Sequence, residues 1–448
     1  MYMGDGKGMK EENQLYWIWL SSRFGVESKE FPSFVDKFDD PYDVYRMSDE
    51  EIEQIDGIGI RLKERLCQKE LNEAYSILKY CKKNKIDIIG YTDKRYPERL
   101  KSIENPPVML YCMGELPSMD TKLCIGMVGT RQMSEYGKQT AYKISYELAA
   151  ANVCIVSGMA LGVDGVSACG AIEGGGTTVA VLGGGLACVY PREHTRLMRS
   201  IVKHGAVISE FPPFERPQPQ NFPKRNRLIS GMCQGVVVVE GSRGSGALIT
   251  ASRAISQGRE LFAIPGKVNE SNSDGPNELI RNGANVILSS DDIIRHYEFL
   301  YHDVINYRAL SNSKRRSELS DSILRSYGVS YVGGKKRFSK TDKNQEPREL
   351  NHSAQDAVNQ KSQAEPEVKA VADNTNRETI DNILLGIDEC SRTVYGMLPS
   401  AESFTPDAIA AKGVGMGDIM TALTILEING LVVSLPGGAY KVTDSSIG

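Results

Sequence analysis

The chain has 448 residues, which is too long for one hydrophobic core and indicates roughly two to four domains. An apolar content of 41% and a charged content of 25% are ordinary for a soluble globular protein. The net charge of −4 excludes a uniformly basic nucleic-acid binder, so any contact with nucleic acid must come from a local basic patch and depend on salt.

The cysteines and histidines show no spacing that suits a metal site. Nine cysteines are scattered without a C-x-x-C pair, and the five histidines lack ligand spacing. The first ten residues contain no apolar h-region, and no stretch reaches transmembrane length. We therefore expect a reduced, cytoplasmic protein without zinc and without membrane contact.

The N-terminal part, residues 1–86, is expected to be an all-α domain of the helix-hairpin-helix or SAM-like kind. Residues 52–66 indicate a helix, a tight turn at Gly57-Ile58-Gly59 and a second helix. Such a turn can offer backbone N–H groups to a DNA phosphate. The same turn is common in helices that only pack together, and packing is the favoured interpretation.

The centre, residues 87–305, alternates β-branched runs with helical patterns. Such an alternation predicts a doubly wound, mainly parallel sheet and therefore an α/β fold. The expected strands are residues 123–128, 153–156, 178–182, 206–209, 236–239, 261–264 and 286–288, and the expected helices include 134–151, 194–204 and 247–257.

A basic cluster lies where one helix of this centre should begin. In the run Phe222-Pro223-Lys224-Arg225-Asn226-Arg227, three cations follow Pro223, a residue that suits a first helical turn. The positive end of a helix dipole repels cations unless an anion is bound. An anion site is favoured here, and a solvated basic face is the alternative.

Residues 306–376 are expected to be a flexible polar linker. From Ser311 to Asn376 the apolar pattern gives way to Ser, Asn, Gln, Lys and Glu, which bury too little surface to offset the entropy of ordering. Basic runs at residues 314–316 and 335–337 would attract nucleic acid without specificity. A solubilising tether is the favoured interpretation of this segment.

The tail, residues 377–448, is expected to form a winged-helix domain. The pattern predicts helices over 380–390, 405–413 and 416–429, followed by a hairpin over 431–442. No Lys or Arg occurs from Gly413 through Tyr440, although a helix in a DNA groove needs cations for phosphates. A protein-contact or structural role is therefore favoured over DNA binding.

Small and basic residues follow five of the expected central strands. Because the carboxyl ends of parallel strands meet at one edge of a sheet, we expect a single ligand site there. The loops in question hold Gly129-Thr130-Arg131, Ser157 to Asp164, Gly183-Gly184-Gly185, Glu210 with the basic cluster, and residues 241–246. Asp164 is more often a helix cap than a general base, and Arg192 either reaches this edge or stays solvated.

Several familiar signatures are absent from these loops. The chain has no G-x-x-x-x-G-K-[ST] sequence, and Arg131 lies where the pyrophosphate of a dinucleotide would bind. No nucleophile with an evident base emerges. We therefore expect no cofactor, no bound metal and no catalytic residues, and the loops suit a nucleic-acid backbone.

In these loops the chain resembles the DNA-processing protein A family, also called DprA or Smf. The matching motifs run in order from Val128-Gly129-Thr130-Arg131, through Ser157 to Asp164 and Phe222 to Arg227, to Leu279 to Ala284. The resemblance implies a non-enzymatic protein that binds single-stranded DNA on an extended Rossmann-like domain and is usually dimeric. Such proteins protect incoming DNA during natural transformation and load the RecA recombinase onto it.

The resemblance also implies which residues contact DNA. The expected set is Gly129, Arg131, Ser157, Gly158, Arg192, Phe222, Lys224, Arg225, Asn226, Arg227, Ser242, Gly244, Ser245 and Gly246. Phe222 would either stack on a base or only cover the helix start. This chain departs from the family in its Gly-Thr-Arg, where Gly-Ser-Arg or Gly-Ala-Arg is common, and in its long linker.

Two other classes of function compete with this one. The first is a nucleotide or nucleoside-monophosphate hydrolase on a related Rossmann-like fold, with Asp164 or Glu240 in acid/base work. Such enzymes typically carry a Pro-Gly-Gly-x-Gly-Thr string, which this chain lacks. The second is an interaction scaffold that acts through the tail and the N-terminal domain.

Overall fold

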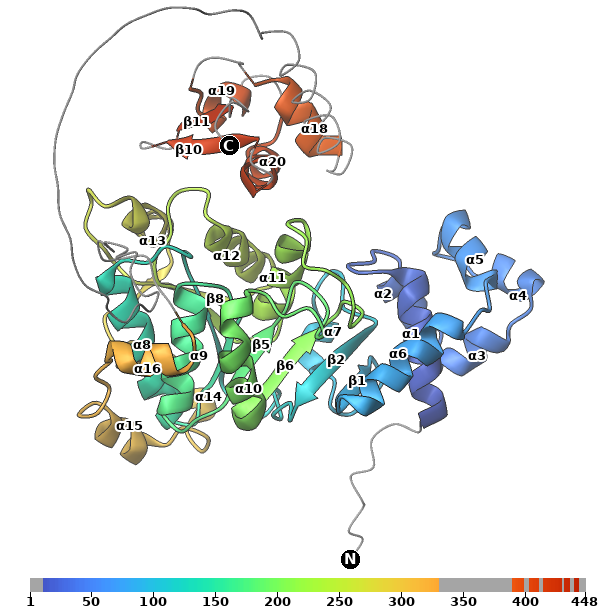
Figure 1. Cartoon of the computed structure of the whole chain (residues 1–448), viewed down its shortest axis with the longest axis horizontal. Coiled ribbons are helices and arrows are strands. Elements are labelled where there is room, and N and C mark those ends of the chain that lie inside the picture. Colours follow the sequence, from blue (N-terminus) through green and yellow to red (C-terminus); the bar gives the residue numbers. More distant parts are fainter. Residues whose placement is uncertain are drawn as a thin grey trace, which may run out of the picture. The chain divides into compact units, whose positions relative to one another are not determined.

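The structure is a computed structural model that describes residues 11–329, 389–398, 403–410, 414–428, 431–435 and 439–442 (Figure 1). These residues belong to two compact units, the first ending at residue 329 and the second beginning at residue 389. None of the helices described is long and apolar enough to cross a bilayer.

Six helices form the N-terminal part of the first unit. They pack around a core that includes Trp17, Phe31 and Leu62, each at most 1% exposed. Ser48 and Glu51 form a capping box at the start of the fourth helix. The helices are α1 (Glu11–Phe24), α2 (Phe31–Val35), α3 (Pro41–Arg46), α4 (Asp49–Glu53), α5 (Ile60–Cys67) and α6 (Asn72–Lys83).

The glycine turn expected between two of these helices joins α4 to α5. Gly57 has a φ of +87°, the left-handed region that favours glycine. The N–H of Gly59 donates to Oε1 of Glu30 at 2.6 Å. A carboxylate of the protein itself therefore holds the N–H group that Gly59 could offer to a phosphate, which agrees with a packing role for this turn.

A nine-stranded sheet forms the centre of the first unit, in the order β1-β2-β6-β5-β4-β3-β7-β8-β9. Strands β3 to β9 pair parallel with one another, whereas β2 pairs antiparallel with both β1 and β6. The strands are β1 (Ile86–Gly90), β2 (Met109–Gly114), β3 (Cys124–Val128), β4 (Cys154–Ser157), β5 (Thr178–Val181), β6 (Gly205–Ser209), β7 (Gly235–Val238), β8 (Glu260–Ala263) and β9 (Asn285–Val286). The predicted mainly parallel, Rossmann-like sheet is confirmed, and β1 and β2 extend it.

Helices cover both faces of this sheet (Figure 1). Ile125 and Met127 of β3 belong to a core that also contains Tyr142 of one flanking helix, whereas Val128 belongs to a second core with Leu228 of another. The pleat of a strand sends successive side chains to opposite faces, which explains the continuous apolar runs. The helices are α7 (Glu98–Lys101), α8 (Glu135–Ala150), α9 (Val163–Glu173), α10 (Thr195–His204), α11 (Asn221–Gly231), α12 (Gly246–Ser256), α13 (Ser271–Arg281) and α14 (Ser290–Tyr301), with a 3₁₀ turn η1 (Arg192–His194).

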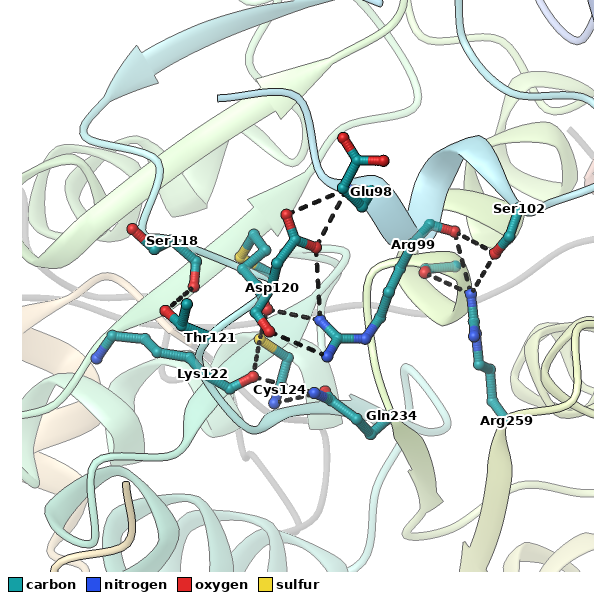
Figure 2. Close-up of polar contacts among 12 residues, drawn as sticks. Glu98, Arg99, Ser102, Ser118, Asp120, Thr121, Lys122, Cys124, Gln234 and Arg259 are labelled. Carbon is teal, nitrogen blue, oxygen red and sulfur yellow. Dashed lines mark hydrogen bonds and ion pairs between the residues drawn. The ribbon is translucent and has the colours of Figure 1, made fainter. Parts of the chain in front are cut away.

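A polar network holds the amino ends of β3 and β7 in place (Figure 2). The side chain of Gln234 accepts from the N–H of Cys124 at 2.8 Å and donates to the carbonyl of Lys122 at 3.0 Å. Arg99 of α7 donates to the carbonyl of Met119 at 2.6 Å. These contacts satisfy loop carbonyls at the amino ends of the strands. The motif-bearing loops lie at the opposite edge of the sheet.

The expected linker begins later than its composition indicates. Residues 307–329 contain α15 (Tyr307–Ser313) and α16 (Asp321–Ser326), and Leu324 is only 2% exposed. Nζ of Lys138 in α8 lies 2.9 Å from Oδ1 of Asp321, and Ser317 donates to Oε1 of Glu147 at 3.0 Å. The prediction of a linker from residue 306 is wrong for this stretch, because a few buried apolar side chains and two charges of α8 order it. The remainder of the expected linker, residues 330–376, lies outside the described residues.

The second unit contains α18 (Glu389–Gly396), α19 (Pro406–Ala410), α20 (Met416–Ile428) and the antiparallel pair β10 (Val432–Leu435) and β11 (Ala439–Val442). Its core includes Val394, Ile409, Leu423 and Tyr440. The first of these helices ends later than the expected 380–390, and residues 380–388 and Gly413 lie outside the described residues. The winged-helix assignment stays a prediction.

Candidate nucleic-acid interface

The five motif-bearing loops lie at one edge of the sheet. Strands β6, β5, β4, β3 and β7 are consecutive neighbours, and β3, β4, β5, β6 and β7 run parallel. The loops that follow them therefore share one side, here called the carboxyl edge. The chain order reverses between β3 and β7, which is the place where open α/β sheets bind ligands.

A carboxylate occupies the start of α8 at this reversal point. Oε2 of Glu240, which follows β7, accepts from the N–H of Ser134 at 2.8 Å, and its Oε1 accepts from the Ser134 hydroxyl. The carbonyl of Glu240 accepts from the N–H of Thr130 at 2.7 Å. An internal anion thus takes the position at which a dinucleotide pyrophosphate binds in related folds, which agrees with the missing dinucleotide fingerprint.

The loop from Ser157 to Asp164 folds around a second buried carboxylate. Oδ2 of Asp164 accepts from the N–H groups of Gly158 at 3.0 Å and Ala160 at 3.5 Å. Burial raises the pKa of Asp164, and the Arg225 guanidinium opposes that shift. Ser157 is fully buried and donates to the Asp164 carbonyl at 3.4 Å, so it supports the loop from inside.

Arg225, expected to contact an anion, connects three elements inside the protein. Its Nη1 donates to the carbonyl of Gly158 at 2.8 Å and to the carbonyl of Val181 at the end of β5. Burial lowers the pKa of Arg225 to about 10. Its Nε donates to Oδ1 of Asn226 at 3.1 Å, and Nδ2 of Asn226 approaches the carbonyl of Gly246 at 3.4 Å. Both residues are more than nine-tenths buried, and they hold the loops of the carboxyl edge in place from the interior of the protein.

Arg227 likewise has a partner inside the protein. Its Nη2 donates to Oε2 of Glu210, and the two side chains are 3% and 4% exposed. Oε1 of Glu27, in the loop after α1, lies 3.9 Å from Nε of Arg227. Helix α11 begins at Asn221, two residues before the expected first turn, so Arg225 and Arg227 lie deeper along the helix than the sequence indicated. Of the three cations expected to form an anion site, only Lys224 is not buried, and it is half-buried.

A cation and two aromatic rings lie close together at an accessible part of the edge. The exposed Arg131 guanidinium lies 5.2 Å from the ring centroid of Phe222, and the Tyr190 ring lies 5.7 Å from it. Phe222 is half-buried against Gly183, where a Cβ would come within 3.0 Å of the ring. We call Arg131, Tyr190 and Phe222 the aromatic–cation cluster.

The remaining expected residues flank this cluster on the carboxyl edge. Arg192 is exposed in η1, directly after Tyr190-Pro191. Gly244 has a φ of +87°, Ser242 is exposed in the turn before α12, and Gly246 is exposed as the first residue of α12. The hydroxyl of Ser245 is buried at the start of α12 and has no hydrogen-bond partner within the described part of the chain.

Sequence reasoning had not placed two of these roles. From the sequence, Tyr190 had no assigned role, although an aromatic residue in the loop that begins with Gly183-Gly184-Gly185 was a usable signal. The capping role of Glu240 had no local signal, because its partner Ser134 is 106 residues away.

Comparisons with known proteins support the sequence resemblance. The family profile described as DNA recombination-mediator protein A matches residues 87–298. The DNA processing protein DprA of Bacillus subtilis is 43% identical over 208 residues, which cover 46% of this chain and 70% of that protein. The DprA of Streptococcus pneumoniae is 40% identical over 207 residues, covering 46% and 73%. The X-ray structure of DNA processing protein A from Streptococcus pneumoniae superimposes with a TM-score of 0.55 at 30% identity, covering 63% of this chain and 97% of that one.

Proposed function

Because this chain belongs to the DNA recombination-mediator protein A family, also called DprA or Smf, we propose that it binds single-stranded DNA along its carboxyl edge and loads RecA onto it. Proteins of this family act in DNA processing and recombination. In this proposal the chain protects incoming DNA during natural transformation and catalyses no reaction itself.

The aromatic–cation cluster is the observation that carries this proposal. An exposed Arg131 beside half-buried Phe222 and 44%-exposed Tyr190 offers a positive charge for a phosphate and ring faces for a base. Stacking of bases on aromatic side chains tolerates any sequence, and a basic groove follows the backbone. In a duplex the base faces are already stacked on one another, so ring faces of this kind favour a single strand.

Two buried carboxylates of the carboxyl edge, Asp164 and Glu240, support binding without hydrolysis. Asp164 and Glu240 are 7% and 2% exposed, and each accepts hydrogen bonds from backbone N–H groups. A hydrolase would need a carboxylate that reaches the sugar. We therefore propose that both stabilise loops, and that nucleoside monophosphates are not cleaved.

The other parts of the chain are proposed to be accessory. We propose that the N-terminal helices and the winged-helix-like second unit flank the central domain, residues 87–305, and that two central domains form a homodimer. Sedimentation at several protein concentrations tests the dimer. RecA-dependent ATP hydrolysis on single strands coated with a single-strand-binding protein tests loading.

Fluorescence anisotropy titrations with full-length protein test the DNA proposal. We expect tighter binding to an oligothymidine than to a duplex of equal length, and weaker binding at about 200 mM than at about 50 mM salt. Arg131→Glu and Lys224→Ala should weaken binding to the single strand. Arg308→Ala is the matched control, because this exposed side chain lies in α15 near the residues that lead into β5, at the opposite edge. Unchanged binding by Arg131→Glu, or release of base from nucleoside monophosphates, would overturn the proposal.

A further inference from the structure

A fully buried histidine lies between two loops of the carboxyl edge. His194 ends η1, two residues after the exposed Arg192, and is 0% exposed. Its ring packs against the start of α9, where a Cβ on Gly165 would lie 2.6 Å from Cε1 of His194. The ring also contacts the loop from Ser157 to Asp164 at the carbonyl of Met159.

Among the described residues the ring makes one hydrogen bond, and that bond identifies the ring nitrogen that carries a proton. Nδ1 of His194 lies 2.9 Å from the carbonyl of Met159, so Nδ1 carries a proton and donates it. Nε2 is buried and has no partner among the described residues. Burial lowers the pKa of His194, which favours the neutral ring, and donation to a carbonyl places its proton on Nδ1.

The acceptor of this bond has an unfavourable backbone conformation. Met159 has a φ of +54°, a region that residues with side chains rarely adopt and that persists only where the surroundings impose it. The next residue toward the N-terminus, Gly158, is fixed by Asp164 at its N–H and by Arg225 at its carbonyl. The hydrogen bond from His194 therefore holds the carbonyl of Met159, the residue whose φ is unfavourable.

We propose that His194 is a positioning residue that holds the Ser157–Asp164 loop in its DNA-binding conformation and joins it to the turn that carries Arg192. This inference rests on the proposed function. The connection runs from His194 to Met159, then through Gly158 to Arg225, whose guanidinium lies 5.9 Å from the Phe222 ring centroid. Loss of the Nδ1 donor leaves the Met159 carbonyl buried without a partner and frees the loop.

Three substitutions of His194 distinguish the effect of losing the N–H donor from the effect of losing the volume of the ring. His194→Asn keeps an N–H donor near the position of Nδ1, His194→Gln places its donor one bond farther away, and His194→Leu removes it. For His194→Leu and His194→Gln we expect affinity for oligothymidine to fall on the order of tenfold, the cost of a lost buried hydrogen bond. For His194→Asn we expect affinity within about threefold of the unchanged protein. The salt dependence should be the same in all four proteins, because no phosphate-binding cation is lost.

The outcomes distinguish this inference from the proposed function. If the unchanged protein binds oligothymidine and Arg131→Glu weakens it, the proposed function stands. Wild-type affinity in His194→Leu, or equal losses in His194→Leu and His194→Asn, would then overturn only the role of His194. If circular dichroism shows that His194→Leu is unfolded, the comparison of His194→Gln with His194→Asn decides in the same way.

Discussion

Arg227 and Glu210 form a buried ion pair beneath the carboxyl edge, with both side chains at most 4% exposed. Glu210 directly follows β6, and Arg227 lies in the second turn of α11, so the pair fixes this helix to the sheet. Burial raises the pKa of Glu210, and Arg227 opposes that shift. Of the basic residues of α11, Arg225 and Arg227 are thus part of the buried structure, whereas Lys224 is partly accessible.

Removal of one partner of this pair should destabilise the fold. For Arg227→Ala we expect a loss of about 3–5 kcal/mol in the free energy of unfolding, because Glu210 stays buried without its counter-charge. Urea denaturation measures the change. The double variant Arg227→Met with Glu210→Leu should recover most of the loss, since it removes both charges and keeps the volume. A cost below about 1 kcal/mol for Arg227→Ala would show that the pair is not buried as described.

Arg131 should contribute to the salt dependence of DNA binding. If its guanidinium contacts one phosphate of a single strand, Arg131→Ala reduces the slope of log affinity against log salt by about 0.7. Anisotropy titrations across a salt series measure the slope. Arg308→Ala should leave it unchanged, and an unaltered slope in Arg131→Ala would mean that no phosphate lies against this side chain.

Phe222 should contribute to affinity without altering the salt dependence. Loss of a base–ring stack in Phe222→Ala is expected to cost about 1–3 kcal/mol of binding free energy. The same titrations measure it, and Tyr75→Ala, which removes a 56%-exposed ring from α6, is the control. Full affinity in Phe222→Ala would instead favour the alternative that this ring only covers the start of α11.

Stability should depend on pH through His194. Its pKa is lowered in the folded chain by burial, opposed by its bond to Met159 and by Glu193, while the unfolded value is about 6.5. Between the two values the unfolded chain binds a proton and the folded chain does not, so the free energy of unfolding rises with pH. This contribution is fully present above about pH 6.5 and is lost as pH falls through the folded pKa.

Denaturation curves between neutral and mildly acidic pH test this sign. The difference in unfolding free energy between the unchanged protein and His194→Asn should decrease as the solution is acidified. A difference that stays constant, or that grows toward acid, contradicts a neutral buried ring.

The segment after α14 should contribute to stability. Leu324 of α16 is 2% exposed, so Leu324→Ala is expected to lower the free energy of unfolding by about 2–5 kcal/mol. Ile255→Ala is the control, since that side chain is 60% exposed in α12. Equal, small effects of both substitutions would instead support the flexible linker that composition alone indicated for residues 307–329.

Most of the central sheet could be predicted because its signal is local. Buried parallel strands are continuous runs of Val, Ile and Leu, as in Val236–Val239, and they alternate with helices of recognisable period. The antiparallel strands β1 and β2 carry a weaker pattern. The order of residues 307–329 escaped prediction because Asp321 and Ser317 bind charges of α8, more than 160 residues earlier in the chain.

The sequence by itself determined the family, the α/β class and the position of the functional loops at the ends of parallel strands. Only the tertiary structure decided which basic side chains reach solvent, because that depends on partners far away in the chain. Arg225 donates to Gly158, 67 residues earlier, and Arg227 to Glu210, 17 residues earlier, whereas Arg131 lies exposed beside Phe222. Motifs describe residue types and spacing, but burial and hydrogen bonding decide whether a cation holds the fold together or faces a ligand.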